Sequence, residues 1–219
     1  MWIEVSLLFK KRFKRIPDKI SEEEQKEKIL YESPKDRHQT KNVESLKNFI
    51  KKDPSNPDSY YELGELYRNK GDYETALSYY RTVIKLDKNY GLAHSRMGDC
   101  YSNLGKMDQA LSHYQSVLNL YPHDELAHYE LGRIYWEKEE YNTSLKCLEI
   151  SLPVTEGNAE VHFYMASCYN ALDEFELAIQ KYEKSLEINP FFTSSHLGLA
   201  EVYLQQDKLD QAEYHTIKA

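Results

Sequence analysis

Long hydrophobic runs are missing from this sequence. Its longest apolar stretch, residues 2–9, is far shorter than the roughly 18 residues that a membrane-spanning helix needs. The basic residues of this region follow the apolar stretch, whereas a secretory signal places them before it. The sequence therefore predicts neither a spanning helix nor a secretory signal.

Cysteine is scarce, with Cys100, Cys147 and Cys168 as the only three. An odd number cannot form a complete disulfide framework, and their spacing matches no paired metal-binding motif. These residues therefore favour small packing roles in a reducing compartment, and we expect a cytoplasmic protein.

Sequence patterns typical of catalysis are also missing. The chain has no glycine-rich phosphate loop, no His-Glu-x-x-His and no Gly-x-Ser-x-Gly. Its many carboxylates follow the pattern of solvated helix surfaces. We therefore expect no catalytic residues, no metal and no cofactor, and a protein that is not an enzyme.

Charge is unevenly distributed along the chain. The formal net charge is -8, but residues 1–20 carry six basic and two acidic side chains, which leaves -12 for the remainder. An acidic surface repels nucleic acid phosphates and favours basic or neutral partners. The main part of the chain is thus not expected to bind nucleic acid.

A tyrosine recurs with a period of 34 residues. Four residues before each tyrosine stands a leucine or methionine, which is followed at once by glycine or alanine. The recurring tyrosines are Tyr67, Tyr101, Tyr135, Tyr169 and Tyr203, and the small residues are Gly64, Gly98, Gly132, Ala166 and Ala200. A period of this length is typical of helical repeats that stack on one another.

This pattern resembles that of the tetratricopeptide repeat family over roughly four fifths of the chain. The resemblance implies an all-α fold: a right-handed superhelical α-solenoid of antiparallel helix pairs. The expected repeat array covers 57–219, with units 57–90, 91–124, 125–158, 159–192 and a partial unit 193–219.

Each unit is expected to hold two helices and a tight turn. Small residues recur at position 20 of the units, where two helices should cross closely. They are Ala76, Ala110, Ser144, Ala178 and Ala212. Tyr80, Tyr114 and Tyr182 recur four residues later and should fill the space between units, and Gly71 and Gly105 should supply left-handed turns.

The third unit departs from this pattern. Pro153 lies inside its expected second helix, and residues 155–158 replace the usual proline turn. Because proline lacks an N–H, we expect that helix to stop a turn early and the array to be softest there.

The N-terminal quarter of the chain is predicted in three pieces. Residues 42–56 match a second helix with its turn, and are expected to form a half-repeat that caps the array. Residues 21–41 predict a short charged helix and a linker. Residues 1–20 are basic and apolar, and three interpretations stay open: a disordered tail or part of a neighbouring domain, a helix on an anionic membrane surface, or a nucleic acid contact.

Histidines at one-period spacing invite a metal or pH-dependent interpretation. They are His94, His128, His162 and His196. Equivalent residues of adjacent units lie roughly 10 Å apart, whereas zinc needs its nitrogens at about 2 Å. Packing between helices is therefore favoured, and a pH-sensitive stability role is the alternative.

The family resemblance implies a concave groove, lined by the first helices, that holds a peptide or partner helix. Carried onto this sequence, the groove has an apolar centre at Tyr129, Trp136, Phe163 and Tyr164. Its carboxylates Glu62, Glu65, Asp99 and Glu130 are expected to select a basic residue. The remaining predicted partner-binding residues are Tyr61, Arg68, Arg96 and Arg133.

Two specialisations of the family are not supported by these positions. Members that bind chaperone C-terminal tails use lysine, asparagine and arginine where this chain has Tyr61, Glu65, Arg96, Leu126 and Glu130. We therefore expect no recognition of chaperone tails. Members attached to O-linked glycosyltransferases carry an asparagine ladder at a position where this chain has none.

The function that the sequence favours is a protein-interaction scaffold or adaptor. Because the last unit stops at Ala219, inside its second helix, one alternative is a non-catalytic arm of a larger enzyme or assembly that continues beyond this residue. A second alternative is an adaptor tethered to a membrane through residues 1–20.

Overall fold

The computed structural model describes residues 43–219, and these residues form helices and turns without any strand. The expected features of residues 1–42, namely the basic segment, the short charged helix and the linker, lie outside the described residues. The chain divides into two compact units, 1–48 and 49–219. Helix α4 (Val43–Lys52) spans the junction between them, and the capping role expected of 42–56 stays a prediction.

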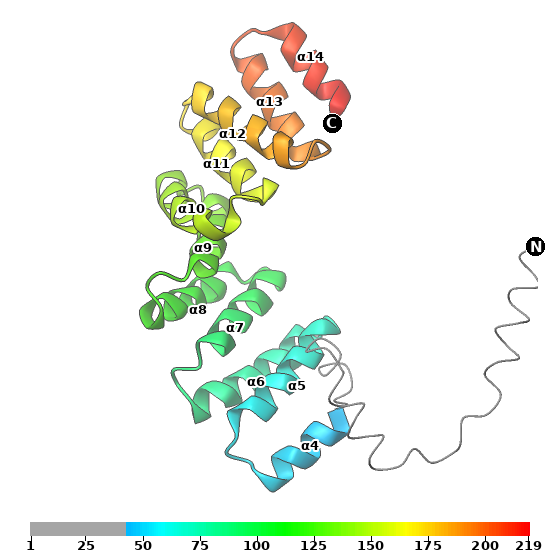
Figure 1. Cartoon of the computed structure of the whole chain (residues 1–219), viewed down its shortest axis with the longest axis vertical. Helices are drawn as coiled ribbons and strands as arrows, with labels where there is room; N and C mark the ends of the chain where they lie inside the picture. Colours follow the sequence, from blue (N-terminus) through cyan, green and yellow to red (C-terminus); the bar gives the residue numbers. More distant parts are fainter. Residues whose placement is uncertain (1–42) are drawn as a thin grey trace, which may run out of the picture. The chain divides into compact units, whose positions relative to one another are not determined.

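Ten helices follow in residues 53–219 and pack as antiparallel pairs, an all-α solenoid as expected (Figure 1). The first helix of each pair starts 34 residues after the previous one. The pairs are α5 (Pro57–Asn69) with α6 (Tyr73–Leu86), α7 (Gly91–Asn103) with α8 (Met107–Leu120), α9 (Glu125–Glu137) with α10 (Tyr141–Thr155), α11 (Ala159–Ala171) with α12 (Phe175–Ile188), and α13 (Thr193–Gln205) with α14 (Leu209–Lys218).

Local sequence explains where many of these helices begin. The side chains of Asn56, Asp124 and Asn158 cap α5, α9 and α11 by accepting hydrogen bonds from backbone N–H groups of the first turn. Such caps satisfy donors that have no partner inside the helix. Side-chain caps therefore help to fix where these three helices begin.

The small residues allow the two helices of a unit to approach closely. Ala76, Ala110, Ser144 and Ala178 are all fully buried. The rings of Tyr80, Tyr114 and Tyr182 are buried as well, as the sequence predicts, and the first two lie directly over Gly64 and Gly98. Each ring fills the space that a side chain on its glycine would need.

The expected early end of the second helix in the third unit is wrong, whereas the expected softness of the array there stays a prediction. Helix α10 continues through Pro153 to Thr155 and is the longest of the described helices. Proline removes only one N–H of the ladder, and the helix closes beyond it with a hydrogen bond from the Glu156 N–H to the Leu152 carbonyl. The buried hydroxyls of Ser151 and Thr155 also bond to backbone carbonyls one turn earlier.

The turns inside the five units share one backbone conformation. Gly71 and Gly105 adopt the expected left-handed geometry, with φ of 79° and 69°. Glu139, Asp173 and Asp207 occupy the same repeat position with φ of 61°, 60° and 56°. A Cβ makes this conformation costly, so the last three units each carry local backbone strain.

The histidines pack between helices. Two of them pair with a second histidine 19 residues later: His94 Nδ1 lies 3.2 Å from His113 Nδ1, and His196 Nδ1 lies 3.0 Å from His215 Nδ1. His196 Nε2 lies 3.2 Å from the Pro190 carbonyl, which can only accept a hydrogen bond. If the Nε2–H of a neutral His196 donates to this carbonyl, its Nδ1 accepts from the Nδ1–H of His215.

Replacing Gly98 with leucine is expected to destabilise the array by about 1 to 3 kcal/mol. A Cβ at this position would lie 2.6 Å from Cζ of Tyr114. The measurement is the midpoint of chemical denaturation. Gly157→Ala is the control, because a Cβ there meets no atom within 4 Å. Equal midpoints for both variants would show that the helices do not depend on this close approach.

Asp173→Gly is expected to stabilise the chain by about 0.5 to 1 kcal/mol, because glycine adopts the positive φ without a steric penalty. The reverse change, Gly105→Asp, should lower the denaturation midpoint by a similar amount. A lower midpoint for Asp173→Gly would mean that the aspartate side chain stabilises the turn more than its backbone strains it.

Acidification is expected to destabilise the fold through His113. Burial, His94 and Arg81 lower the pKa of His113 to about 4, and Tyr101 stacks on its ring. The unfolded chain binds the proton near the ordinary pKa of about 6.5, so stability is complete above this pH and declines as the pH falls towards 4. Between about pH 7.5 and 5.5 the loss from His113 should be about 1 kcal/mol.

Thermal unfolding of the wild type and of His113→Gln at these two pH values measures this effect. Glutamine keeps a donor without a titratable group, so the variant should lose less stability on acidification. An identical loss in both proteins would assign the pH dependence to other groups.

Candidate functional site

The first helices of the five pairs are α5, α7, α9, α11 and α13, and we call their combined surface the first-helix face. Besides packing on its own partner α12, helix α11 contacts both α9 and α13. First helices of neighbouring units are thus close enough for one ligand to touch several of them. All twelve predicted partner-binding residues lie on α5, α7, α9 and α11.

Carboxylates and arginines alternate along the part of this face formed by α5, α7 and α9. Arg68 donates two hydrogen bonds to Glu65, at 3.0 and 3.1 Å. Arg96 donates to Asp99 at 3.1 Å and has its Nε 3.5 Å from Glu65 Oε1. The first two units therefore share a chain of ion pairs, and the third holds a separate pair on α9, where Arg133 donates to Glu130 at 2.8 Å.

Buried tyrosines connect this network to the interior. The Tyr80 hydroxyl donates to Glu65, and the Tyr114 hydroxyl donates to Asp99 at 2.8 Å. Burial and the neighbouring carboxylate raise the pKa of both tyrosines, so each remains a donor at neutral pH. The carboxylates are thus oriented from below by the core and from the side by arginine.

Burial and ion pairing oppose each other at these carboxylates. Burial alone would raise the pKa of Glu65, but the hydrogen bonds from Arg68 and Tyr80 outweigh it and lower the pKa. At Glu130 burial prevails over the attraction of Arg133, and the pKa is raised. A hollow of about 520 Å³ lies over this region and is lined by Arg68, Asp99, Glu130 and Arg133, among others.

The expectation that Glu65, Asp99 and Glu130 select a basic residue of a partner stays a prediction, and their ion pairs oppose it. All three already hold arginines of the same chain. A ligand cation would have to displace these arginines and leave them without their carboxylates, which costs free energy. The sequence pattern could not show this pairing, because it depends on side-chain geometry across units.

Aromatic side chains gather where α9 and α11 meet. The ring of Trp136 packs edge-on against Tyr164 and Phe163, with centroids 5.1 and 6.2 Å apart, and the latter two rings are 5.4 Å apart. Trp136 Nε1 donates to Ser167 Oγ at 2.9 Å. These three residues, hereafter the aromatic cluster, are half-buried, so the structure brings together most of the expected apolar centre.

Tyr129 is the exception within that expected centre. Only 8% of it is exposed, and its hydroxyl donates to Glu160 at 2.9 Å. Burial and this carboxylate raise its pKa. Tyr129 belongs to the core beneath α9 and α11, so its replacement would disturb packing. Tyr61 is also half-buried, with its ring against Tyr80 and Tyr90.

Exposed leucines mark a part of the face beyond the twelve predicted partner-binding residues. Leu92 and Leu126 are 58% and 64% exposed, and they line a hollow of about 560 Å³ with Tyr90 and Tyr121. Both occupy the second position of their unit, one period apart. This recurrence was available in the sequence, since a leucine repeated at a position without a packing role indicates a surface contact.

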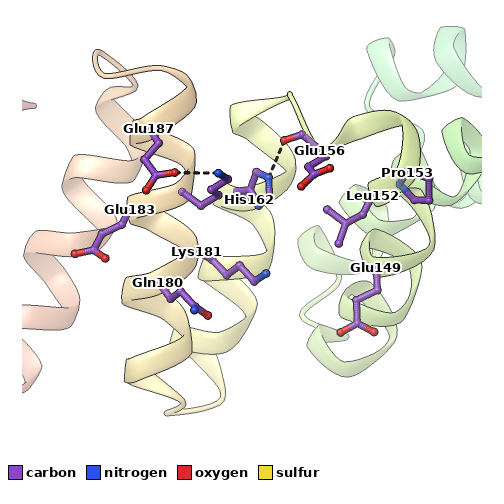
Figure 2. Close-up of a pocket in the computed structure, with 10 residues that line it drawn as sticks. Glu149, Leu152, Pro153, Glu156, His162, Gln180, Lys181, Glu183 and Glu187 are labelled. Atoms are coloured by element: carbon purple, nitrogen blue, oxygen red, sulfur yellow. Dashed lines mark hydrogen bonds and ion pairs between the residues drawn. The ribbon is translucent and has the colours of Figure 1, made fainter.

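A further pocket of about 650 Å³ lies on the other side of the array and was not predicted (Figure 2). Its lining comes from α10, the start of α11 and α12, and includes Pro153 and Glu149. His162 Nε2 lies 2.9 Å from the Glu156 carbonyl at its rim. The unusual residues 153–158 are the feature of the sequence that could have indicated this pocket. They led instead to the prediction of an early helix end.

None of the helices in residues 43–219 is long and apolar enough to cross a membrane. Within the same range, no three histidine, cysteine or acidic side chains are grouped so that they could hold a metal ion.

Comparison with known proteins identifies one family of helical repeats. Sequence models of the tetratricopeptide repeat match residues 45–78, 91–124 and 159–192, and a TPR repeat model matches 64–105. No curated protein matches the sequence significantly.

Several solved structures share the fold at low identity. MamA from residue 41 onwards of Desulfovibrio magneticus RS-1 is 23% identical, with a TM-score of 0.70 over 74% of this chain and 92% of that chain. YrrB, described as a TPR protein with an unusual peptide-binding site, is 17% identical, with a TM-score of 0.70 over 79% and 89%. A chain of the APC/C hetero-tetramer Cut9-Hcn1 is 20% identical, with a TM-score of 0.65 over 79% and 34%.

The matched segments together span more than half of the chain, two of them coincide with the pairs α7/α8 and α11/α12, and the neighbouring structures have the same fold. The chain therefore belongs to the tetratricopeptide repeat family.

Proposed function

We propose that this protein is an interaction scaffold whose first-helix face is a concave groove that binds a segment of a partner protein. Repeats of this family serve protein interaction in general, and the finer assignment to this face rests on its side chains. The observation that carries it is the apolar surface left open there. Leu92, Leu126, Leu197 and Leu204 are each more than half exposed.

These leucines flank the half-buried aromatic cluster on both sides along the array. Leu92 and Leu126 lie on α7 and α9, and Leu197 and Leu204 lie on α13. Contiguous exposed apolar surface next to aromatic residues is typical of protein contact sites, where tryptophan, tyrosine and arginine supply much of the binding energy. The peptide-binding site described for YrrB, a protein of the same fold, is consistent with this proposal.

The role proposed is binding rather than catalysis. Glu65, Asp99 and Glu130 are engaged in ion pairs, and none of the twelve predicted residues is a histidine, serine or cysteine nucleophile. We also propose a reducing compartment such as the cytoplasm. Cys100, Cys147 and Cys168 are free thiols, and burial raises the pKa of Cys100 to about 12.

Peptide selection tests the proposed groove. Random dodecapeptides displayed on phage are selected against the wild-type protein, and the affinity of the enriched peptides is then measured for Leu126→Ser/Leu197→Ser. Both side chains are more than half exposed, so the fold should persist. Loss of their apolar contacts is expected to weaken binding about tenfold or more.

The matched control is Ile150→Ser/Val154→Ser, which changes two exposed apolar residues of α10, a second helix. Its affinity should stay within about twofold of wild type. Loss of binding in this control and not in the leucine variant would move the site to the other side of the array. Failure to enrich any peptide would contradict peptide binding by the groove.

A further inference from the structure

We propose that the segment bound by this face is basic as well as apolar, and that it binds over α9, α11 and α13. The proposed contact surface, hereafter the acidic-aromatic patch, consists of Trp136, Glu137, Glu160, Phe163, Tyr164 and Glu201. This inference rests on the proposed function and specifies the chemistry of the partner.

Carboxylates differ between the two halves of the first-helix face. On α5, α7 and α9, Glu65, Asp99 and Glu130 are neutralised by arginines of the chain. Glu137, Glu160 and Glu201 are exposed, and no lysine or arginine of residues 43–219 forms an ion pair with any of them. Of these six carboxylates, only the three near the aromatic cluster have no lysine or arginine of residues 43–219 to compensate their charge.

The three carboxylates lie around the aromatic cluster. Glu137 follows Trp136 at the end of α9, and Glu160 precedes Tyr164 by one turn on α11. Both raise the pKa of Tyr164, after the larger effect of burial, so both are electrostatically close to its hydroxyl. Glu201 lies on α13 and acts in the same way on Tyr182, whose ring is 6.0 Å from Phe163.

Arg133, the arginine beside the aromatic cluster, already has a carboxylate partner. Arg133 pairs with Glu130 at 2.8 Å, and its guanidinium lies over the ring of Tyr164 at 6.0 Å from the centroid. Within residues 43–219 it therefore does not compensate Glu137, Glu160 or Glu201. Its position also shows that a guanidinium can lie over this aromatic surface while a carboxylate holds it.

A lysine or arginine of a partner fits this arrangement on two grounds. Its charge pairs with an open carboxylate, and its aliphatic stem covers the exposed edge of the aromatic cluster. An acidic segment or a nucleic acid would place like charges against three carboxylates and be repelled. The partner is therefore a protein segment with basic residues on either side of an apolar anchor.

The spacing of the helices limits the length of that segment. From α9 to α13 there are two helix-to-helix steps of roughly 10 Å each. An extended chain advances about 3.3 Å per residue, so roughly six residues cross the patch. Basic residues two to six positions apart, with a leucine or aromatic residue between them, can reach the carboxylates and the aromatic cluster together.

The test compares two variants with the same change in charge. In the first, Glu137→Gln, Glu160→Gln and Glu201→Gln remove the charge of the patch but keep hydrogen-bonding capacity, so Tyr129 retains an acceptor at residue 160. In the second, Glu149→Gln, Glu183→Gln and Glu213→Gln change exposed glutamates of α10, α12 and α14. The probe is a random dodecapeptide library displayed on phage and selected against each protein.

The wild type and the second variant are expected to enrich peptides with lysine or arginine beside leucine or an aromatic residue. The first variant should lose this preference and bind the wild-type peptides about tenfold or more weakly, and added salt should weaken wild-type binding. Equal losses in the two variants would indicate a general charge effect and overturn the proposal.

Failure of this inference differs from failure of the proposed function. Enriched peptides that lack basic residues but lose affinity in Leu126→Ser/Leu197→Ser would retain the groove and reject the basic partner. In another outcome, basic peptides are enriched but bind the wild type and the first glutamate variant equally well. This outcome would reject the three glutamates of the first-helix face as their contact. No enrichment, or binding insensitive to the leucine variant, would reject the groove itself.

Discussion

The packing of a tyrosine ring against a glycine, which has no side chain, underlies this structure. In the first two units a tyrosine of the second helix lies over a glycine of the first, and its hydroxyl reaches the carboxylate next to that glycine: Tyr80 over Gly64 to Glu65, and Tyr114 over Gly98 to Asp99. One contact thus brings the two helices together, fills the core and orients a charge on the surface. Core packing and surface chemistry cannot vary independently in these units.

Variation at the same positions produces the different character of the later units. In the third unit, Leu148 replaces the tyrosine and packs on Gly132, so no hydroxyl reaches the first-helix face from below. In the fourth unit, Ser167 replaces the carboxylate and accepts a hydrogen bond from Trp136. Aromatic residues gather on the surface where α9 and α11 meet. The first half of the face is therefore ion-paired, and the second half is aromatic.

Packing also explains why the face suits recognition. Groups that are already held by several partners lose little conformational freedom when a ligand binds, so more of the contact energy is available for affinity. Trp136 is held by Ser167 and by two rings, which makes it a rigid surface for a ligand. The leucines and the three glutamates of the same face are exposed to a ligand.

Much of the fold follows from the 34-residue pattern, because a repeated helix pair has few ways to bury its apolar side. Helix boundaries, the close crossings at alanine and serine, and the left-handed turns at Gly71 and Gly105 were all predictable from local rules. The end of α10 was not, since the rule against proline inside helices does not include hydroxyls that bond to the backbone nearby. The pairing of His94 with His113 was also outside the reach of a spacing argument.

The candidate site was also predictable from the sequence only in part. The sequence by itself determined which residues belong to the first helices, and hence which twelve share one side of the array. Only the tertiary structure decided that Tyr129 is buried, that Glu65, Asp99 and Glu130 hold arginines, and that Glu137, Glu160 and Glu201 do not. The reason is physical: periodicity assigns a residue to a side of its helix, whereas ion pairing and burial depend on distances between side chains of different units.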